Sequence, residues 1–372
     1  MNTMGLQTIS SICQNNNFSI NGKIGYFSSL GEMILGDSID LLSNLDDNSI
    51  DLVITSPPFA LQRQKEYGNK EQYEYVEWLS QFAHLVYRKL KENGSFVLDL
   101  GGAYQKGVPV RSLYNFRVPI KFCDDIGFYL AEEFFWHNPS KLPSPIEWVN
   151  KRKIRVKDSV NTVWWFSKTE WPKSNIKNVL TPYSERMKKL LENPDKYYKP
   201  KARPSGHSIS DTFSNDNGGA IPSNLLQISN SESNSLYLRH CKLLGIQGHP
   251  ARFPEKLPEF FIKMLTDEND LVVDIFGGSN TTGFVAEKLN RQWISMEQSL
   301  EYVATSVLRF IPNDYSIENI KKIYNEIMNN NFININSRIN QNELFEIIKT
   351  EITSPNKRLA HRRLSAARAT GG

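Results

Sequence analysis

The chain has 372 residues, a hydrophobic content of 40% and a formal net charge of +4. This length suits one large domain, or a core domain that carries an insert. The longest mostly apolar runs, such as Ile50–Ile54 and Leu271–Phe276, have the length of a strand, which argues against a membrane-spanning helix and against a membrane partner. Residues 1–23 are polar and rich in asparagine, without the apolar core of a secretory signal.

Cysteine usage indicates a reducing compartment. The three cysteines, Cys13, Cys123 and Cys241, are scattered and form no CxxC pair. We therefore expect a cytoplasmic protein with neither a disulfide framework nor a metal site.

The net charge depends on the last residues of the chain. Residues 356–372 hold five Lys or Arg residues and no acid, and without these cations the net charge of +4 would become −1. This Arg- and Ala-rich tail differs in composition from the segment before it, so we expect it to be disordered or appended and leave it out of the fold prediction. Any affinity for nucleic acid must then come from local clusters of cations.

The chain between residues 32 and 310 alternates between strand-like and helix-like segments. In chain order, strands are expected at 32–35, 50–54, 95–100, 128–136, 161–166, 271–276 and 292–296, and helices at 38–45, 73–90, 112–124, 257–265, 279–289 and 300–310. Such alternation predicts an α/β fold with an open, doubly wound and mostly parallel sheet. Residues 317–351 are expected to be helical, polar and peripheral.

The alternation lapses between residues 169 and 248, where Pro, Ser, Asn and Gly are frequent. This stretch is too long for an ordinary loop in a compact α/β unit, so we expect an inserted subdomain with partner-specific contacts. The predicted division is 24–168 and 249–312 for the two halves of the main domain, 169–248 for the insert, 313–355 for a helical extension and 356–372 for the tail.

Ser56-Pro57-Pro58-Phe59 follows the predicted strand at 50–54. Each proline lacks an N–H, so the carbonyls of this corner and the Ser56 hydroxyl can face an amine donor without competing backbone donors. Phe59 adds a flat face for a planar ring. The motif therefore suits the exocyclic amino group of a nucleobase, although Pro-Pro is also common in simple turns.

A second motif follows the predicted strand at 271–276. Gly277 and Gly278 allow a close approach of the backbone to a ligand at the carboxyl end of a parallel strand, where doubly wound sheets bind nucleotides. Glu297, about twenty residues on, ends the next strand and is placed for two ribose hydroxyls. The turn matches neither the G-x-G-x-x-G dinucleotide fingerprint nor a phosphate-binding loop with Gly-Lys-Ser/Thr.

The two motifs, in this order, resemble those of the β group of DNA amino-methyltransferases, which use S-adenosyl-L-methionine. The resemblance implies a Rossmann-like methyltransferase fold with a catalytic half at 24–168, a target-recognition insert at 169–248 and a cofactor-binding half at 249–312. The run His249-Pro250-Ala251-Arg252-Phe253-Pro254 is similar to the group's segment that lines the methionine end of the site. The cofactor-binding residues implied are Asp274, Phe276, Gly277, Gly278, Ser279, Asn280, Thr281, Glu297, His249, Pro250 and Phe253.

The cofactor turn departs from the pattern usual in that group, Asp-Pro-Phe-x-Gly-Ser-Gly-Thr-Thr. Ile275 stands for the proline and Asn280 for the last glycine. Asparagine tolerates a positive φ better than other non-glycine residues, so we expect the turn to be kept. With no second His or acid at metal-ligand spacing, His249 is expected to pack against the cofactor rather than to act as a base or a ligand.

The implied chemistry is methyl transfer to an amine whose lone pair is delocalised into a ring. Acceptors at Ser56 and at a proline carbonyl would draw the amine hydrogens out of the ring plane, and most of the catalysis would be positioning. Asp99 is expected at the end of the next strand. In one interpretation it accepts a hydrogen bond or the released proton. In the other it only caps the turn at Gly101. The target base must flip out of the duplex and stack on Phe59.

Methylation of cytosine at carbon 5 is excluded, because it needs a cysteine nucleophile, typically after proline. The residues before the three cysteines are Ile12, Phe122 and His240. Ser-Pro-Pro resembles the motif of the N4-cytosine enzymes, whereas Asp or Asn before Pro-Pro mostly accompanies adenine. Methylation of adenine N6 stays the alternative. The close similarity to one N4-cytosine member of the group implies the palindrome CAGCTG, with methylation of its inner cytosine.

Cations gather at two places that suit the phosphates of double-stranded DNA. The densest run contains Lys151, Arg152, Lys153, Arg155 and Lys157, and the insert adds Arg186, Arg203 and His207. A run of charge is otherwise usually a solvated face. The resemblance implies a bacterial restriction–modification enzyme, with the cognate endonuclease as a functional rather than physical partner, and we expect a monomer. A nicotinamide oxidoreductase and a non-catalytic DNA-binding module are the competing interpretations.

Overall fold

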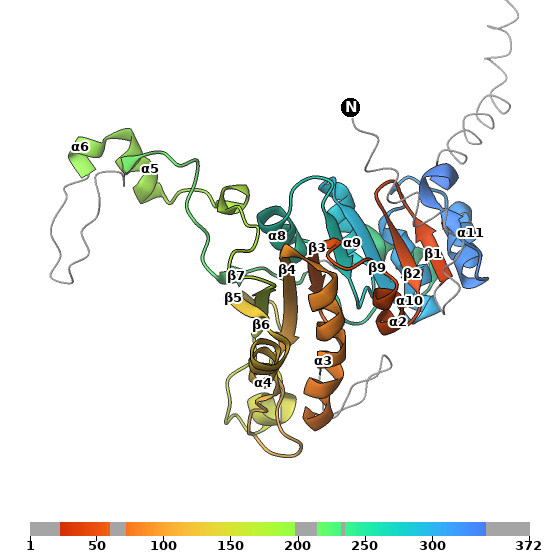
Figure 1. Ribbon diagram of the computed structural model, residues 1–372, viewed down its shortest axis with the longest axis horizontal. Helices are drawn as coiled ribbons and strands as arrows, with labels where there is room; N and C mark the ends of the chain where they lie inside the picture. The colour runs from red at the N-terminus through yellow and green to blue at the C-terminus, as the bar shows by residue number, and fades with distance from the viewer. Residues whose placement is uncertain (1–22, 60–71, 198–213, 232–234, 340–372) are drawn as a thin grey trace, which may run out of the picture.

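The computed structural model describes residues 23–59, 72–197, 214–231 and 235–339 (Figure 1). The strands are β1 (Lys23–Phe27), β2 (Gly31–Leu35), β3 (Ile50–Thr55), β4 (Leu90–Gly101), β5 (Tyr129–His137), β6 (Val160–Ser167), β7 (Leu225–Gln227), β8 (Leu271–Asp274), β9 (Gln292–Glu297) and β10 (Ile333–Asn334). The α-helices are α2 (Ser38–Ser43), α3 (Gln72–Lys89), α4 (Tyr114–Lys121), α5 (Glu185–Glu192), α6 (Pro194–Tyr197), α7 (Leu236–Leu244), α8 (Lys256–Leu265), α9 (Thr281–Lys288), α10 (Leu300–Ser306) and α11 (Ile317–Met328). Shorter helical turns are η1 (Phe122–Ile126), η2 (Glu147–Lys151), η3 (Ile176–Val179) and η5 (Val307–Arg309).

The described strands form one sheet in the order β10-β1-β2-β9-β8-β3-β4-β6-β5-β7. The five neighbours β2, β9, β8, β3 and β4 are all parallel, so their carboxyl ends lie at one edge. β6 runs antiparallel to both β4 and β5. The predicted doubly wound, mostly parallel α/β fold is therefore confirmed.

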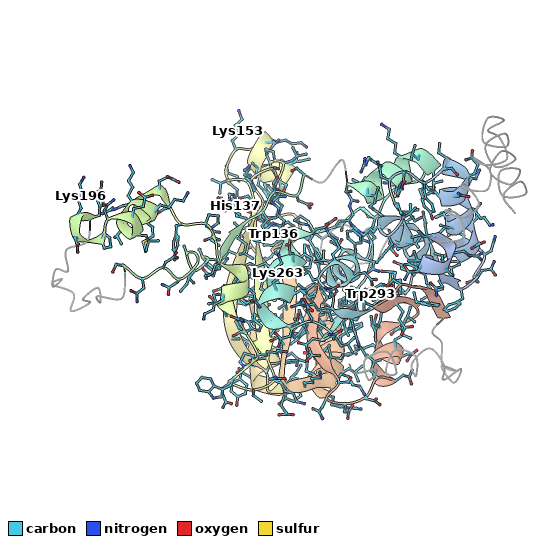
Figure 2. The ribbon with its side chains drawn as sticks, turned by 90° about the horizontal axis from the view of Figure 1, so that it is seen from above. Trp136, His137, Lys153, Lys196, Lys263 and Trp293 are labelled. Atoms are coloured by element: carbon cyan, nitrogen blue, oxygen red, sulfur yellow. The ribbon has the colours of Figure 1, made fainter. Side chains whose placement is uncertain are left out.

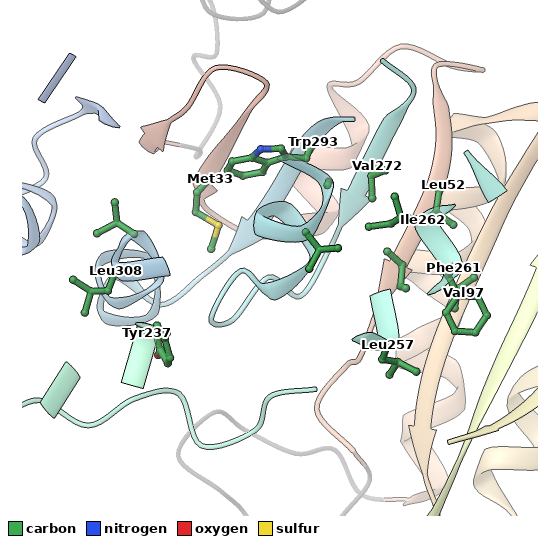
Figure 3. Close-up of a cluster of buried hydrophobic side chains, with 14 of the residues drawn as sticks. Met33, Leu52, Val97, Tyr237, Leu257, Phe261, Ile262, Val272, Trp293 and Leu308 are labelled. Atoms are coloured by element: carbon green, nitrogen blue, oxygen red, sulfur yellow. The ribbon is translucent and has the colours of Figure 1, made fainter. Parts of the chain in front are cut away.

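Helices cover both faces of this sheet. Neighbouring strand residues point to opposite faces, so Val272 belongs to one buried cluster and Val273 to the other. On the first face, α8 contributes Phe261 and Ile262, which face Leu52, Val97 and Val272 from three neighbouring strands (Figure 3). On the second face, the sheet packs against α2, α3 and α4. Because both faces are covered, all six residues of β3 are buried.

The predicted strands and helices up to residue 310 correspond to observed elements, with ends that differ by a few residues. The prediction for residues 317–351 is confirmed in part, because residues 317–328 form the helix α11, but the described segment is not polar throughout and also contains a strand. α11 buries Ile320, Ile323 and Ile327, and β10 then pairs in parallel with β1 at the sheet edge. A two-residue strand carries too little periodicity to be recognised from the sequence. Residues 340–351 lie outside the described residues.

The segment at 169–248 is divided in space. α5 and α6 lie on an arm that extends away from the sheet (Figure 1), whereas β7 pairs in parallel with β5. α7 buries Tyr237 and Cys241 in the cluster that also contains α8. The assignment of residues 169–248 to an inserted recognition subdomain stays a prediction. The same holds for the other predicted domain boundaries. Within the described ranges, no helix is long and apolar enough to cross a membrane.

The helix α11 offers a matched test of its contribution to the core. Ile320 is fully buried, whereas Ile317, one turn earlier, is 48% exposed. We expect Ile320→Ala to lower the free energy of unfolding by about 2–4 kcal/mol, because it leaves a cavity, and Ile317→Ala to lower it by less than about 1 kcal/mol. Urea unfolding of both variants measures the difference. Equal small losses would show that α11 does not belong to the cooperative core.

Candidate active site

A cavity of about 710 Å³ opens at the edge where the parallel strands end. This is the crevice in which open α/β sheets bind ligands. Fifteen of the sixteen residues predicted for catalysis or cofactor binding line it: Ser56, Pro57, Pro58, Phe59, Asp99, Asp274, Phe276, Gly277, Gly278, Ser279, Thr281, Glu297, His249, Pro250 and Phe253. The exception is Asn280, which is fully buried behind the turn. Two motifs more than two hundred residues apart therefore share one cavity.

Ser56 belongs to a hydrogen-bonded group of three polar side chains. Its hydroxyl donates to Asp99 Oδ2 at 3.1 Å, and Asn161 Nδ2 donates to Asp99 Oδ1 at 3.1 Å. Asn161 lies beside Asp99 because β6 runs antiparallel to β4, which pairs Asn161 with Gly101. The single hydrogen of the Ser56 hydroxyl is thus directed at the carboxylate. Its lone pairs remain as acceptors.

Burial controls the charge of Asp99. The side chain is 4% exposed, and removal from water raises its pKa from 3.8 to about 6, while the hydrogen bonds from Asn161 and Ser56 act in the opposite direction. At neutral pH the carboxylate is therefore mostly ionised and accepts both hydrogen bonds.

The ring of Phe59 reaches the end of β4. A Cβ atom at Gly101 would lie 2.5 Å from Phe59 Cε2, so only glycine leaves room for this ring. Gly101 itself is held by the Tyr114 hydroxyl, which donates to its carbonyl. Gly101, in the turn that Asp99 was considered to cap, thus provides space for the aromatic ring.

The carboxylate of Asp274 connects the two motifs. Its Oδ1 accepts from the Thr55 hydroxyl at 2.6 Å and from the Phe276 N–H at 3.1 Å, and its Oδ2 accepts from the Thr282 hydroxyl at 2.6 Å. Thr55 is the residue before Ser56, whereas Thr282 lies in the first turn of α9. Asp274 is 2% exposed, so these bonds fix the end of β3 against the turn after β8.

The cofactor turn keeps its shape without the usual glycine. Asn280 adopts φ 52°, as expected for asparagine in this position. Its side chain accepts from the Gly283 N–H at 3.1 Å and from the Ser295 hydroxyl at 2.7 Å, and it donates to the Tyr26 hydroxyl at 2.9 Å. Asn280 therefore holds the turn from behind and leaves Gly277, Gly278 and Ser279 at the cavity wall.

Glu297 lies at the end of β9, across from the glycine turn. Its Oε2 accepts from the Gly278 N–H at 2.9 Å, and its Oε1 accepts from the Ser299 N–H at 2.9 Å. Burial raises the pKa of this carboxyl group above its usual value of 4.5. These backbone bonds, together with one from Gln298, orient the carboxylate in the cavity wall, where it can accept from a ligand hydroxyl.

His249 packs on the glycine turn. A Cβ atom at Gly278 would lie 3.2 Å from His249 Cε1, and the ring of Tyr302 meets the imidazole edge to face at 4.3 Å between centroids. Among the residues that the structure describes, no group of three or more His, Cys, Asp or Glu side chains could hold a metal ion. The geometry gives His249 packing contacts within the cavity wall.

The charges around the cavity suit a cationic ligand. Its described acidic lining residues are Asp37, Asp99, Asp274, Glu297 and Glu301, whereas the Lys and Arg residues are Lys141 and Arg252. A sulfonium with an amino group would be favoured by this excess of carboxylates, and the cavity has the size typical of a small-molecule site. The residues at hand therefore fit S-adenosylmethionine.

Several cavity residues were missed by the sequence analysis. They are Asp37, Ser38, Trp78, Asn138, Lys141, Asn161, Asn230 and Tyr302. Most lie singly in segments without a motif. Asp37 carried the clearest signal, because it caps α2 directly after a predicted strand, and its Oδ1 accepts from the Ile39 N–H at 2.8 Å.

The densest basic run borders the cavity. It lies in the β5–β6 loop at 138–159, which contributes Asn138, Lys141 and Ser159 to the lining. The five predicted cations of this run are all exposed. Lys157 Nζ donates to the carbonyls of Pro139 and Lys141, both at 3.3 Å, and so joins the two sides of the loop.

The other cations of the run also have protein contacts. Lys151 and Arg152 pair with Glu147, and the Arg155 guanidinium donates to the Pro109 carbonyl at 2.9 Å. Lys153 lies at the outer end of the loop (Figure 2). The run therefore forms an ordered, exposed cationic surface.

The second group of predicted cations is only partly described. Arg186 is exposed on α5, on the arm that also carries Lys196 (Figure 2). Arg203 and His207 lie outside the described residues. The structure therefore brings the first basic run to the edge of the cavity, and of the second group it describes only Arg186, on the arm.

The fold and the site define an enzyme with a nucleotide-type cofactor cavity next to an acceptor-lined aromatic corner. A family model described as DNA methylase matches residues 50–308, and the chain belongs to this family. Its class of substrate is therefore DNA.

Individual relatives agree with this assignment. The type II methyltransferase M.PvuII of Proteus hauseri is 65% identical over 339 residues, covering 91% of this chain and 100% of that protein. M.BglII of Bacillus subtilis is 26% identical over 274 residues, covering 74% and 67%. The solved structure of PvuII DNA methyltransferase (cytosine-N4-specific) matches with a TM-score of 0.70 and 58% identity, covering 84% of this chain and 98% of that one.

The raised pKa of Asp99 predicts a pH-dependent effect on stability. Below pH 3.8 both folded and unfolded states bind the proton, whereas between pH 3.8 and about 6 only the folded state keeps it, so stability falls as the pH rises through this window. We expect Asp99→Asn to be more stable than the wild type by at most about 3 kcal/mol above pH 6, with a smaller gain at pH 5. Urea unfolding at pH 5 and pH 8 measures this, and a gain that does not change with pH would contradict the assignment.

Proposed function

We propose that this protein is a site-specific DNA methyltransferase that transfers a methyl group from S-adenosylmethionine to N4 of cytosine. The observation that carries the proposal is the hydrogen bond from the Ser56 hydroxyl to Asp99. It leaves Ser56 as a pure acceptor beside two prolines and an aromatic ring, which is the arrangement that an exocyclic amine requires. M.PvuII is 65% identical to this chain, and the matching solved structure is named PvuII DNA methyltransferase (cytosine-N4-specific). That name supports the choice of cytosine.

The protein groups act mainly by positioning. An amine hydrogen donated to Ser56 Oγ is held out of the base plane, which reduces the delocalisation of the nitrogen lone pair into the ring. Phe59 stacks on the flipped base and fixes its plane. The lone pair is then free to face the methyl group of the donor, so the barrier falls largely through orientation.

The cofactor, when bound, would supply the electrophilic methyl group, and its S–CH3 bond would break with the electron pair remaining on sulfur, so that a neutral thioether leaves. Glu297 would hold the ribose hydroxyls, the turn at 277–279 would approach its nucleoside part, and the segment with His249, Pro250 and Phe253 would line the methionine end. As the new N–C bond forms, the amine loses one proton. Ser56 and the ionised Asp99 offer the nearest path for it.

The DNA is expected to lie across the mouth of the cavity. Base flipping costs a few kcal/mol, so contacts to the phosphates must hold the distorted duplex. The exposed run from Lys151 to Lys157 on the bordering loop suits this task, and Arg186, Arg203 and His207 are proposed as further DNA contacts.

The finer assignments rest on the relationship to M.PvuII. We propose CAGCTG as the target, with its inner cytosine methylated, and a type II restriction–modification system in a bacterial cytoplasm as the setting. A cognate endonuclease would then be a functional partner, and the enzyme would act as a monomer. Methylation of adenine N6 in the same cavity is the alternative, because both bases present an exocyclic amine.

Replacing Ser56 tests the carrying observation. We expect Ser56→Ala to lower the transfer of tritiated methyl groups into CAGCTG-containing duplex DNA at least about a hundredfold, because the acceptor of the amine is lost. Ser43→Ala, an exposed serine on α2, serves as the control and should keep full activity. Nucleoside analysis should place the label in N4-methylcytosine. Label in N6-methyladenine would refute the cytosine assignment, and equal activity of both variants would refute the role of Ser56.

The pKa of Asp99 predicts the pH dependence of the reaction. Once protonated, Asp99 can donate to Ser56, whose own hydrogen then turns toward the substrate amine. We therefore expect kcat to fall as the pH drops below about 6 and to be constant above it. Asp99→Asn should be slow at every pH and lose this inflection. A wild-type profile that is flat between pH 5 and pH 8 would rule out this role for Asp99.

A further inference from the structure

A buried tyrosine that does not line the cavity supports the wall assigned to the cofactor. Tyr237 in α7 is fully buried, and its hydroxyl accepts from the His249 backbone N–H at 2.8 Å. The same hydroxyl is hydrogen-bonded to the side chain of Thr305. This fixes the start of the segment that carries His249, Pro250 and Phe253.

The ring of Tyr237 also contacts the guanidinium group of a buried arginine, Arg309. The Arg309 guanidinium lies 4.8 Å from the ring centroid and is 3% exposed. Its Nε donates to the Ser279 carbonyl at 2.6 Å, and Nη2 donates to Ser279 Oγ at 3.0 Å. Arg309 therefore holds both polar groups of a residue in the glycine turn (Figure 3 shows Tyr237 next to Leu308, the neighbour of Arg309).

The two supported segments touch each other at the cavity. The imidazole of His249 packs on Gly278, and Ser279 follows directly. The glycine turn thus lies between His249 on one side and Arg309 on the other. Tyr237 contacts both, through its hydroxyl and through its ring. A change at Tyr237 is therefore expected to displace both the segment that carries His249 and the glycine turn. Ser56 and Asp99 are supported separately, by β4 and β6.

We propose that Tyr237 is a positioning residue that sets the affinity for the methyl donor without taking part in methyl transfer. This inference rests on the proposed function. Without the hydroxyl, the partly buried His249 N–H loses its acceptor, and we expect the segment that carries it to shift so that this N–H finds another partner. The free protein would then populate arrangements that do not bind the donor, and the observed affinity would fall in proportion.

The test is the variant Tyr237→Phe, which keeps the ring and removes only the hydroxyl. Calorimetric titration with S-adenosylmethionine and with S-adenosylhomocysteine, in the absence of DNA, gives Kd. We expect Kd for both, and KM for the donor, to rise about tenfold, a change of about 1.4 kcal/mol. At saturating donor, kcat and KM for DNA should stay within about twofold of the wild-type values.

Tyr315→Phe is the matched control. The Tyr315 hydroxyl donates to the Ile339 carbonyl at 2.6 Å, and Tyr315 does not line the cavity. The same chemical change there should leave Kd unchanged. If Tyr237→Phe fails to fold, as judged by its thermal unfolding without ligand, Arg309→Lys tests the same wall, because it keeps the charge but loses the paired contact with Ser279. It should show the same rise in Kd and KM with kcat retained.

Two results would overturn the inference: an unchanged Kd in a folded Tyr237→Phe protein, or a loss of kcat that saturating donor does not restore. The wild-type titration separates this outcome from a failure of the proposed function. A wild-type protein that binds neither S-adenosylmethionine nor S-adenosylhomocysteine would refute the methyltransferase assignment itself.

Discussion

The site depends on one buried carboxylate, that of Asp274. Its two oxygens accept hydrogen bonds from Thr55, at the end of β3, and from Thr282, at the start of α9 behind the glycine turn. These residues are 219 and 8 positions away in the sequence. Because buried polar groups are costly when unpaired, this arrangement is stable only when β3 and β8 lie side by side in the observed register. The distance between the acceptor corner and the donor site is thereby fixed.

The catalytic corner is supported in the same way by polar groups that are fully paired. Asp99 is nearly inaccessible, and its two partners, Ser56 and Asn161, come from different strands. Burial raises the pKa of this carboxyl group to about 6. A modest change in the surroundings of Asp99 would therefore change the hydrogen-bonding character of Ser56, which connects the packing of β4 and β6 to the chemistry.

The fold and most of the cavity were predictable because they are encoded locally. Gly277-Gly278 after an apolar strand and Ser56-Pro57-Pro58 after another each identify a strand end, and parallel strand ends meet at one edge. Asn161 could not be predicted, since its contact with Asp99 depends on the antiparallel pairing of β6, which no local pattern specifies. Tyr237 was hidden in a Ser- and Asn-rich segment, and its role depends on contacts with residues up to 72 positions later, which come together only in the folded chain.

The antiparallel direction of β6 has a consequence for how such an enzyme can diversify. If β6 ran parallel to β5, the connection would have to cross to the far edge of the sheet. Because the two strands are antiparallel, both ends of the 138–159 loop lie at the cavity. Lengthening a loop whose ends are already close costs little conformational entropy, and the parallel strands that carry the methyl-donor site take no part in it. Insertions in this loop can therefore leave the cavity residues on the parallel strands unchanged.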